Sequence, residues 1–184
     1  EGLDELREET EAFLAGRDME PKILPSKSLP KHYPIAFNLI PQIDKFVEDD
    51  YTKEEMKMVN ETKKIMEDYE MRITATTIRV PVYRSHSESV NIELEKEVDL
   101  GAMREALAKF PGVTVQDDPS KQEYPMPLYT SEKDDVYVGR LRRDESCEKS
   151  YNMWVVGDQI RKGAALNTLQ IAETMIKTAG SKIG

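Results

Sequence analysis

The sequence contains few of the residues that bind metals or form disulfides. Its one cysteine, Cys147, cannot form an internal disulfide, which indicates a reducing compartment. Its two histidines, His32 and His86, lie too far apart for the ligand spacing of a structural zinc site. No run approaches the roughly 18 apolar residues of a membrane span, and no signal-peptide pattern opens the chain. We therefore expect a cytoplasmic protein without a metal site or a membrane segment.

Positive charge is also scarce. Lys and Arg number 26 against 35 Asp and Glu, which gives a formal net charge of −9. Because nucleic-acid binding depends on basic patches that neutralise phosphates, this balance argues against a nucleic-acid partner. It does not exclude an anionic small molecule, which needs only one or two local cations. The 184 residues, 39% hydrophobic and 33% charged, are typical of a globular domain with an extension.

The chain opens with an apolar pattern that predicts a helix at 2–14, ending at Gly16. An irregular connector is expected next, because proline fixes φ and removes a backbone donor. Its prolines are Pro21, Pro25, Pro30 and Pro34. Glu1 has no methionine before it, so we expect the chain to be part of a longer protein.

Hydrophobic periodicity predicts an α+β fold, with a mixed β-sheet covered by helices. The runs IAFNLI (35–40) and RITATTIRVPVY (72–83) predict two strands. Thr52 and Glu55 have capping-box spacing and predict a helix that continues through residue 66. Further strands are expected at 90–94, 113–115, 136–141 and 153–156, a long loop at 117–135, and helices at 99–110, with Phe110 facing inward, and at 160–178.

His86 is the first candidate for chemistry. It lies in the polar segment RSHSES (84–89), just beyond a predicted strand, where a side chain can be aimed into a cleft. Histidine titrates near neutral pH and therefore suits general acid–base catalysis. The alternative is a surface histidine, or one whose hydrogen bonds are satisfied in a polar turn.

Three charged residues form a second set of candidates. The planar guanidinium of Arg79 can bind a carboxylate through two parallel hydrogen bonds, although a structural salt bridge to a glutamate is the alternative. Glu54 and Lys57 lie three positions apart in a predicted helix and share a face. They could bind the opposite charges of a zwitterionic or phosphorylated substrate, or simply form a solvated helix face.

Cys147 and His32 are interpreted as bystanders. Glu145 and Glu148 flank the cysteine, and neither would stabilise a nucleophilic thiolate. His32 lies among the prolines of the connector, where a structural role is the simpler interpretation.

Five segments together resemble the aspartate-semialdehyde dehydrogenases. They are AFNLIPQID (36–44), KEEMKMVNETKKIM (53–66), IRVPVYRSHSESVNIE (78–93), VGRLRRD (138–144) and MWVVGDQIRKGAALNTLQIAE (153–173). They occur in order over nearly the whole chain. The resemblance implies an opening helix and connector at 1–34 and, at 35–158, a catalytic and dimerisation domain like that of glyceraldehyde-3-phosphate dehydrogenase. It implies a final helix at 159–184 that returns to a nucleotide-binding domain.

The resemblance also implies a reaction. Members of this family use NADPH to reduce L-aspartyl 4-phosphate to L-aspartate 4-semialdehyde, with release of phosphate, in lysine, methionine, threonine and isoleucine synthesis. The family's substrate arginine falls on Arg79, and its acid–base histidine on His86. The glutamate that meets the α-amino group falls on Glu54, the phosphate-binding lysine on Lys57, and a residue near the NADP nicotinamide on Gln159. A homodimer is expected.

Two elements of the family are missing from the sequence: the Asn-Cys nucleophile segment and the Gly-rich phosphate loop, since no Gly-x-Gly-x-x-Gly occurs. We therefore expect no dehydrogenase activity from this chain alone. Two alternatives stay open. One is an N-acetyl-glutamyl-phosphate reductase, although its blocked substrate amine would gain nothing from Glu54. The other is a non-catalytic dimerisation module.

Overall fold

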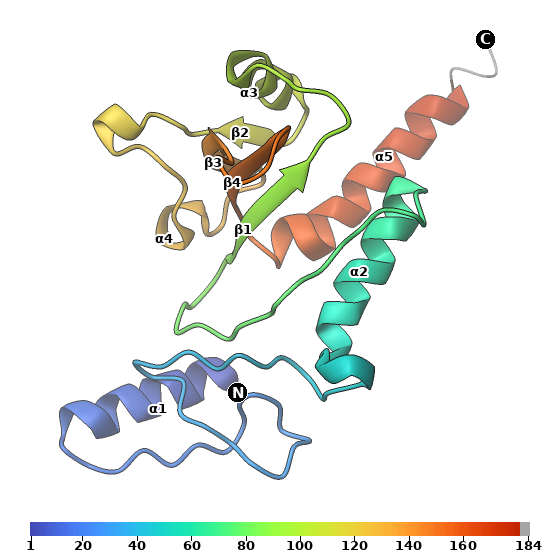
Figure 1. The fold of residues 1–184 in the computed structure, drawn as a ribbon. Coiled ribbons are helices and arrows are strands. Elements are labelled where there is room, and N and C mark those ends of the chain that lie inside the picture. Colours follow the sequence, from blue (N-terminus) through green and yellow to red (C-terminus); the bar gives the residue numbers. More distant parts are fainter. Residues whose placement is uncertain (181–184) are drawn as a thin grey trace. The chain divides into compact units, whose positions relative to one another are not determined.

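The structure, a computed structural model, describes residues 1–180. The chain divides into a first unit, Glu1–Tyr83, and a second unit, Arg84–Gly184. Helices and long irregular segments make up the first unit, and the strands of the described residues all belong to the second (Figure 1). Each unit has a hydrophobic core of its own.

Helix α1, Gly2–Leu14, ends where the sequence predicts. Gly16 follows at φ +66°, a left-handed conformation that glycine adopts without the steric penalty of a Cβ. The connector at 17–34 contains no helix or strand, as predicted. The buried core of the first unit consists of Leu6, Ile35, Ala36 and Ile40.

Two buried glutamates of α1 hold the connector in place. Glu5 accepts the backbone N–H groups of residues 22–24. Glu9 accepts those of Ile35 and Ala36, at 2.7 and 3.0 Å. Because hydrogen bonds to a charged acceptor are stronger than neutral ones, these carboxylates replace the backbone partners that an irregular segment lacks.

The predicted strand at 35–40 is wrong. These residues include buried apolar side chains, but the chain turns at Phe37, whose φ is +57°. The first two N–H groups of the run donate to Glu9 and are not available to a sheet. Only Ile40 forms a β-bridge, to Arg79.

The predicted strand at 72–83 is also wrong. Within it, only Arg79 forms a backbone bridge to another segment, and the N–H of Thr77 donates instead to the side chain of Glu55. A strand needs a ladder of hydrogen bonds to a partner, and an alternating pattern does not specify that partner.

Helix α2, Lys53–Met66, begins at the predicted capping box. The hydroxyl of Thr52 accepts the N–H of Glu55 at 3.3 Å, and the Glu55 carboxylate accepts the N–H of Thr52 at 2.7 Å. Val59 on its inner face is buried. A 3₁₀ helix, Glu48–Asp50, precedes it.

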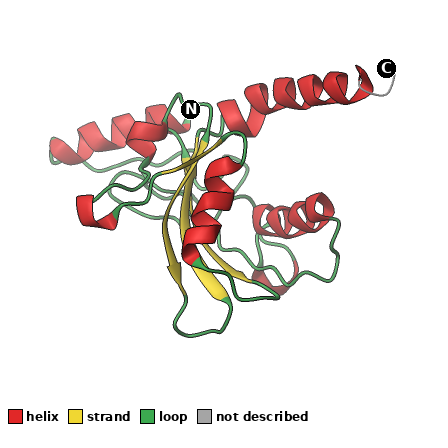
Figure 2. Ribbon diagram, turned by 90° about the horizontal axis from the view of Figure 1, so that it is seen from above, coloured by secondary structure: helices red, strands yellow, loops and turns green. Residues whose placement is uncertain are grey.

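The second unit is built on a mixed four-stranded sheet of order β1-β4-β3-β2. Its strands are yellow in Figure 2. Strands β1 and β3 both pair antiparallel with β4, and β2 pairs parallel with β3. The predicted α+β class is therefore confirmed, and the two predicted strands that are missing both fall in the first unit. The strands are β1, His86–Glu93; β2, Val113–Val115; β3, Val136–Arg143; and β4, Ser150–Gly157.

Helix α3, Leu100–Lys109, packs on this sheet. Its Met103 forms the core of the second unit with Leu141 of β3 and the fully buried Tyr151 of β4. Phe110, predicted to face inward, is 66% exposed. The helix ends at the residue before it, so Phe110 does not continue the apolar face.

The predicted loop at 117–135 contains a 3₁₀ helix, Pro119–Lys121, and a short helix α4, Pro127–Thr130. The predicted helix at 160–178 begins as a π-helix, Arg161–Ala165, and continues as α5, Leu166–Gly180. None of the helices within residues 1–180 combines the length and the apolar character that crossing a membrane requires.

Candidate functional site

The five predicted site residues are distributed over both units. Glu54 and Lys57 on α2 and Arg79 on the segment that follows it belong to the first unit, whereas His86 and Gln159 belong to the second.

Glu54 and Lys57 pair with each other on the first turns of α2. The Lys57 Nζ lies 3.3 Å from Oε1 of Glu54, and the two side chains are 54% and 37% exposed, respectively. An ion pair this exposed contributes at most about 1 kcal/mol. Either charge can therefore exchange its partner for a ligand group at little cost, so the pair is compatible with a ligand site as well as with a solvated helix face.

Glu55 joins α2 to the segment that carries Arg79. Its Oε1 accepts the N–H of Thr77 at 2.8 Å and the Thr77 hydroxyl at 3.4 Å. Burial opposes ionisation of this carboxyl, but the N–H groups of Thr52 and Thr77 outweigh it, and the pKa of Glu55 is lowered. The capping-box pattern identifies Glu55 in the sequence. Its second partner, Thr77, lies 22 residues away, and no local sequence pattern predicts that contact.

Arg79 is fixed through its backbone. Its N–H and C=O bond Ile40 at 2.9 and 3.1 Å. The Nε of its partly buried side chain is enclosed and makes no hydrogen bond, and no carboxylate within residues 1–180 pairs with the guanidinium. The salt bridge considered as an alternative is therefore not found in the described part of the chain. A buried donor without a partner is costly, and an incoming anion would remove that cost.

His86 is the first residue of β1, opposite Gly157 of β4. The prediction that His86 lies just beyond a strand is therefore wrong, because His86 itself begins β1 and residues 72–83 form no strand. The imidazole is exposed and makes no hydrogen bond with the described residues. A group of this kind can exchange protons with a ligand, since no protein partner occupies its nitrogens.

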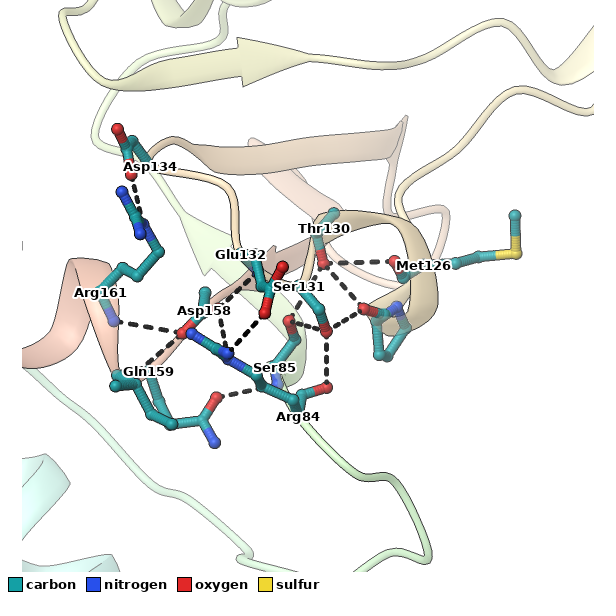
Figure 3. Close-up of polar contacts among 12 residues, drawn as sticks. Arg84, Ser85, Met126, Thr130, Ser131, Glu132, Asp134, Asp158, Gln159 and Arg161 are labelled. Carbon is teal, nitrogen blue, oxygen red and sulfur yellow. Dashed lines mark hydrogen bonds and ion pairs between the residues drawn. The ribbon is translucent and has the colours of Figure 1, made fainter.

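The residue before His86 is buried and conformationally restrained. Ser85 has φ +78°, which is unusual for a residue with a Cβ. Its N–H donates to Oε1 of Gln159 at 2.8 Å, and its hydroxyl lies 3.2 and 3.3 Å from those of Ser131 and Thr130 (Figure 3). These contacts hold the entry to β1 in one conformation.

Asp158, fully buried, is the centre of the ionic contacts beside β1 (Figure 3). Its Oδ2 lies 2.7 Å from Nε of Arg84 and accepts the N–H of Glu132 at 2.7 Å. Its Oδ1 accepts the N–H groups of Ile160 and Arg161 at 2.9 and 3.1 Å. Burial opposes ionisation, but these backbone N–H groups and the Arg84 side chain outweigh it, so the pKa of Asp158 is lowered.

Within the second unit, the structure brings the predicted Gln159 to the residue next to His86. Asp158 and Ser85 were not predicted. The only local signal for Asp158 is an acidic residue directly before a predicted helix, where carboxylates cap N–H groups. Nothing in the sequence reveals the contact between Gln159 and Ser85, which lie 74 residues apart.

Neither of the two predicted bystanders takes part in these contacts. Cys147 is exposed, and its thiol lies 3.7 Å from the carbonyl oxygen of Glu148. The Nε2 of His32 is buried without a hydrogen bond in the connector of the first unit. Within residues 1–180, no three or more His, Cys, Asp or Glu side chains lie together so that they could hold a metal ion.

The family model and the related sequences that match this chain point to the same family. A family model described as semialdehyde dehydrogenase, dimerisation domain, matches residues 1–162. The aspartate-semialdehyde dehydrogenase of Bacillus subtilis (strain 168) is 49% identical over 178 residues, which are 96% of this chain and 51% of that protein. That of Aquifex aeolicus (strain VF5) is 47% identical over 175 residues, which are 95% of this chain and 50% of that protein.

Solved structures agree in fold. Aspartate semialdehyde dehydrogenase II from Vibrio cholerae aligns with a TM-score of 0.85 and 39% identity, covering 96% of this chain and 50% of that one. The same protein complexed with ASA aligns with the same values. The chain spans about half the length of the curated relatives that it matches.

Proposed function

Because the chain belongs to the semialdehyde dehydrogenase dimerisation-domain family, we propose that it forms the substrate-binding and dimerisation half of an aspartate-semialdehyde dehydrogenase. In the complete enzyme, L-aspartyl 4-phosphate is reduced to L-aspartate 4-semialdehyde and phosphate is released. This reaction serves the synthesis of lysine, methionine, threonine and isoleucine. A soluble, cytoplasmic location fits such a role.

Arg79 recognises the α-carboxylate of the substrate. Its enclosed Nε without a hydrogen-bond partner is the observation that supports the proposal most directly. The backbone bridge to Ile40 and the Glu55–Thr77 bond fix the segment that carries the guanidinium. A planar fork fixed in this way can bind a carboxylate through two parallel hydrogen bonds.

Glu54 and Lys57 recognise the other two charges of the substrate. Glu54 binds the α-ammonium group, and Lys57 binds the phosphate. In the structure each of the two neutralises the other at 3.3 Å. When the substrate binds, this weak, exposed ion pair is replaced by two others. Glu54 then pairs with the ammonium group of the substrate, and Lys57 pairs with its phosphate.

His86 moves the proton. A cysteine thiolate supplied by the rest of the enzyme attacks the acyl phosphate, phosphate leaves, and a thioester remains to be reduced. His86 takes the proton from that thiol before the attack, or gives a proton to the hemithioacetal oxygen that forms when the thioester is reduced. Cys147 does not serve as this nucleophile, because it is an exposed residue between two glutamates.

We propose that the main binding site for NADP belongs to the other half of the enzyme. The sequence contains no Gly-x-Gly-x-x-Gly, and the carbonyl oxygen of the Gln159 side chain accepts the N–H of Ser85. The amide nitrogen of Gln159 makes no hydrogen bond with the described residues. We propose that this nitrogen approaches an NADP nicotinamide bound by the other half of the enzyme. The chain alone therefore supplies no reduction step.

Substitution of Arg79 in the complete enzyme tests the proposal. We expect Arg79→Lys to raise the KM for L-aspartate 4-semialdehyde by roughly tenfold or more, because lysine keeps the charge but loses the fork. Arg142→Lys, at an exposed arginine of β3, is the matched control and should leave the KM unchanged. A KM that stays the same in both variants would remove Arg79 from the substrate site.

Three further measurements separate the alternatives. With the complete enzyme, L-aspartyl 4-phosphate should be reduced and N-acetyl-glutamyl phosphate should not, because Glu54 requires a free amine. The isolated chain should form a homodimer in sedimentation experiments and should not reduce NADP with semialdehyde and phosphate. NADPH formation by the isolated chain that disappears in Cys147→Ser would contradict the proposed division of labour.

A further inference from the structure

The two residues that precede His86 are each held by one of the two residues that follow β4. Arg84 pairs with Asp158 at 2.7 Å, and the N–H of Ser85 donates to Gln159 at 2.8 Å. His86 itself lies opposite Gly157, the last residue of β4. The antiparallel pairing of β1 and β4 is therefore continued beyond the strand ends by side chains (Figure 3).

The Ser85 contact fixes a conformation that the backbone would not adopt unaided. A φ of +78° is unfavourable at a residue with a Cβ, so the surroundings must hold it. Gln159 binds the N–H, and Ser131 and Thr130 lie within hydrogen-bond distance of the hydroxyl. The conformation at Ser85 sets the direction in which the chain enters β1, and with it the direction from which the His86 side chain leaves the backbone.

The Arg84 contact has a rigid anchor. Asp158 is fully buried and accepts three backbone N–H groups, from the turn after α4 and from the start of the final helix. A buried carboxylate with all these donors cannot move without losing them. The guanidinium of Arg84, which is 27% exposed, is therefore tied to a fixed point of the second unit.

We propose that Gln159 and Asp158 are positioning residues for His86, Gln159 acting through the Ser85 N–H and Asp158 acting through Arg84. The inference rests on the proposed acid–base function of His86, and it gives Gln159 a second role besides its approach to the cofactor. Neither residue touches the reacting atoms.

NMR spectroscopy of this chain tests the geometry without any activity. The chain has two histidines, so His86→Gln identifies the His86 ring signals. Gln159→Met has a similar size but no acceptor, and it should move both the Ser85 amide signal and the His86 ring signals. Gln159→Glu keeps the acceptor and should retain both near their wild-type positions. Ring signals that stay in place in Gln159→Met would overturn the proposal.

The second contact is tested at Arg84, because Asp158 variants could fail to fold. Arg84→Met removes the ion pairs to Asp158 and to the exposed Glu132 but leaves Asp158 its three N–H donors, and it should move the His86 ring signals. Arg84→Lys keeps the charge and should move them less. Identical His86 signals in wild type and Arg84→Met would overturn the role of Asp158.

Kinetics of the complete dehydrogenase then test the consequence for catalysis. Gln159→Met should lower kcat by roughly 10- to 100-fold and change the KM for semialdehyde less than about twofold, as expected for a misplaced catalytic group. A loss confined to the KM for NADP would overturn the positioning role in catalysis. The NMR result would still stand if the proposed dehydrogenase function failed, so the two failures are distinguishable.

Discussion

The Oε1 atom of Glu55 accepts the backbone N–H of Thr77 at 2.8 Å, while the other carboxylate oxygen accepts the N–H of Thr52 at 2.7 Å. One side chain therefore closes the start of α2 and holds the segment that leads to Arg79. The two oxygens accept N–H groups from two different parts of the chain, so the side chain needs two acceptor oxygens.

Glu55→Gln should destabilise the first unit by about 1–3 kcal/mol, because glutamine has one acceptor oxygen and leaves one buried N–H unpaired. Equilibrium unfolding in denaturant measures the change. Glu54→Gln is the matched control, an adjacent and more exposed glutamate, and should change the free energy of unfolding by no more than about 0.5 kcal/mol. Equal effects of the two substitutions would show that the hydrogen bonds from Thr52 and Thr77 to the second acceptor oxygen of Glu55 do not stabilise the unit.

Stability should fall at acidic pH because of Glu55 and Asp158. In both, burial raises the pKa, but hydrogen bonds to the carboxylate prevail and lower it below the ordinary values of 4.5 and 3.8. A lowered folded-state pKa means that the unfolded chain takes up protons first. The stabilisation is therefore complete above the ordinary values and is lost as the pH falls toward the folded-state values.

Unfolding free energies measured between about pH 7 and pH 3 test this prediction. Glu55→Gln should be less stable than wild type at neutral pH, and the difference should narrow toward the acidic end. A constant difference across the range would mean that the ionised form of Glu55 is not the stabilising one.

His86→Gln in the complete enzyme should lower kcat by roughly 10²- to 10⁴-fold, the usual contribution of a general acid or base, and should leave the substrate KM nearly unchanged. Glutamine can form hydrogen bonds but cannot exchange protons near neutral pH. His32→Gln controls for the loss of an imidazole elsewhere in the chain. Normal turnover of the His86 variant would exclude it from the mechanism.

Gly139 in β3 should not tolerate a side chain. A Cβ at this position would lie 2.2 Å from the backbone oxygen of Gln116 and 2.6 Å from Cδ of Pro125. Because neither neighbour is a flexible side-chain end, Gly139→Ala should destabilise by about 1–3 kcal/mol or more. Gly163→Ala, whose nearest atom lies 3.9 Å away in a helical segment, should be neutral or stabilising by up to about 1 kcal/mol. Thermal unfolding of the two variants measures whether each substitution lowers or raises the stability.

Local sequence patterns predicted local structure well. The capping box at Thr52, the end of α1 before Gly16 and the position of α3 all depend on residues a few positions apart, and the structure confirms them. The resemblance of the five segments also led to the family that the comparisons show.

The errors came from contacts between distant residues. The alternation at 72–83 predicts a strand, but Thr77 donates to a side chain and only Arg79 finds a backbone partner. At 35–40, a carboxylate of α1 binds the N–H groups that a strand would need. A sheet requires a partner strand, which local alternation does not reveal. The same limit hid Asp158 and the Ser85–Gln159 contact, while the roles of the predicted site residues stay proposals.

Among residues 1–180, strand β1 lies at the edge of the sheet and pairs with β4 alone. Strands β3 and β4 are joined by a short turn and can form a hairpin early, whereas β1 must close a much longer loop to reach them. We therefore expect the edge strand to dock late in folding. During synthesis on the ribosome, the segment around His86 is made before its partners at 157–159. It can therefore reach its final position only after those residues have been synthesised.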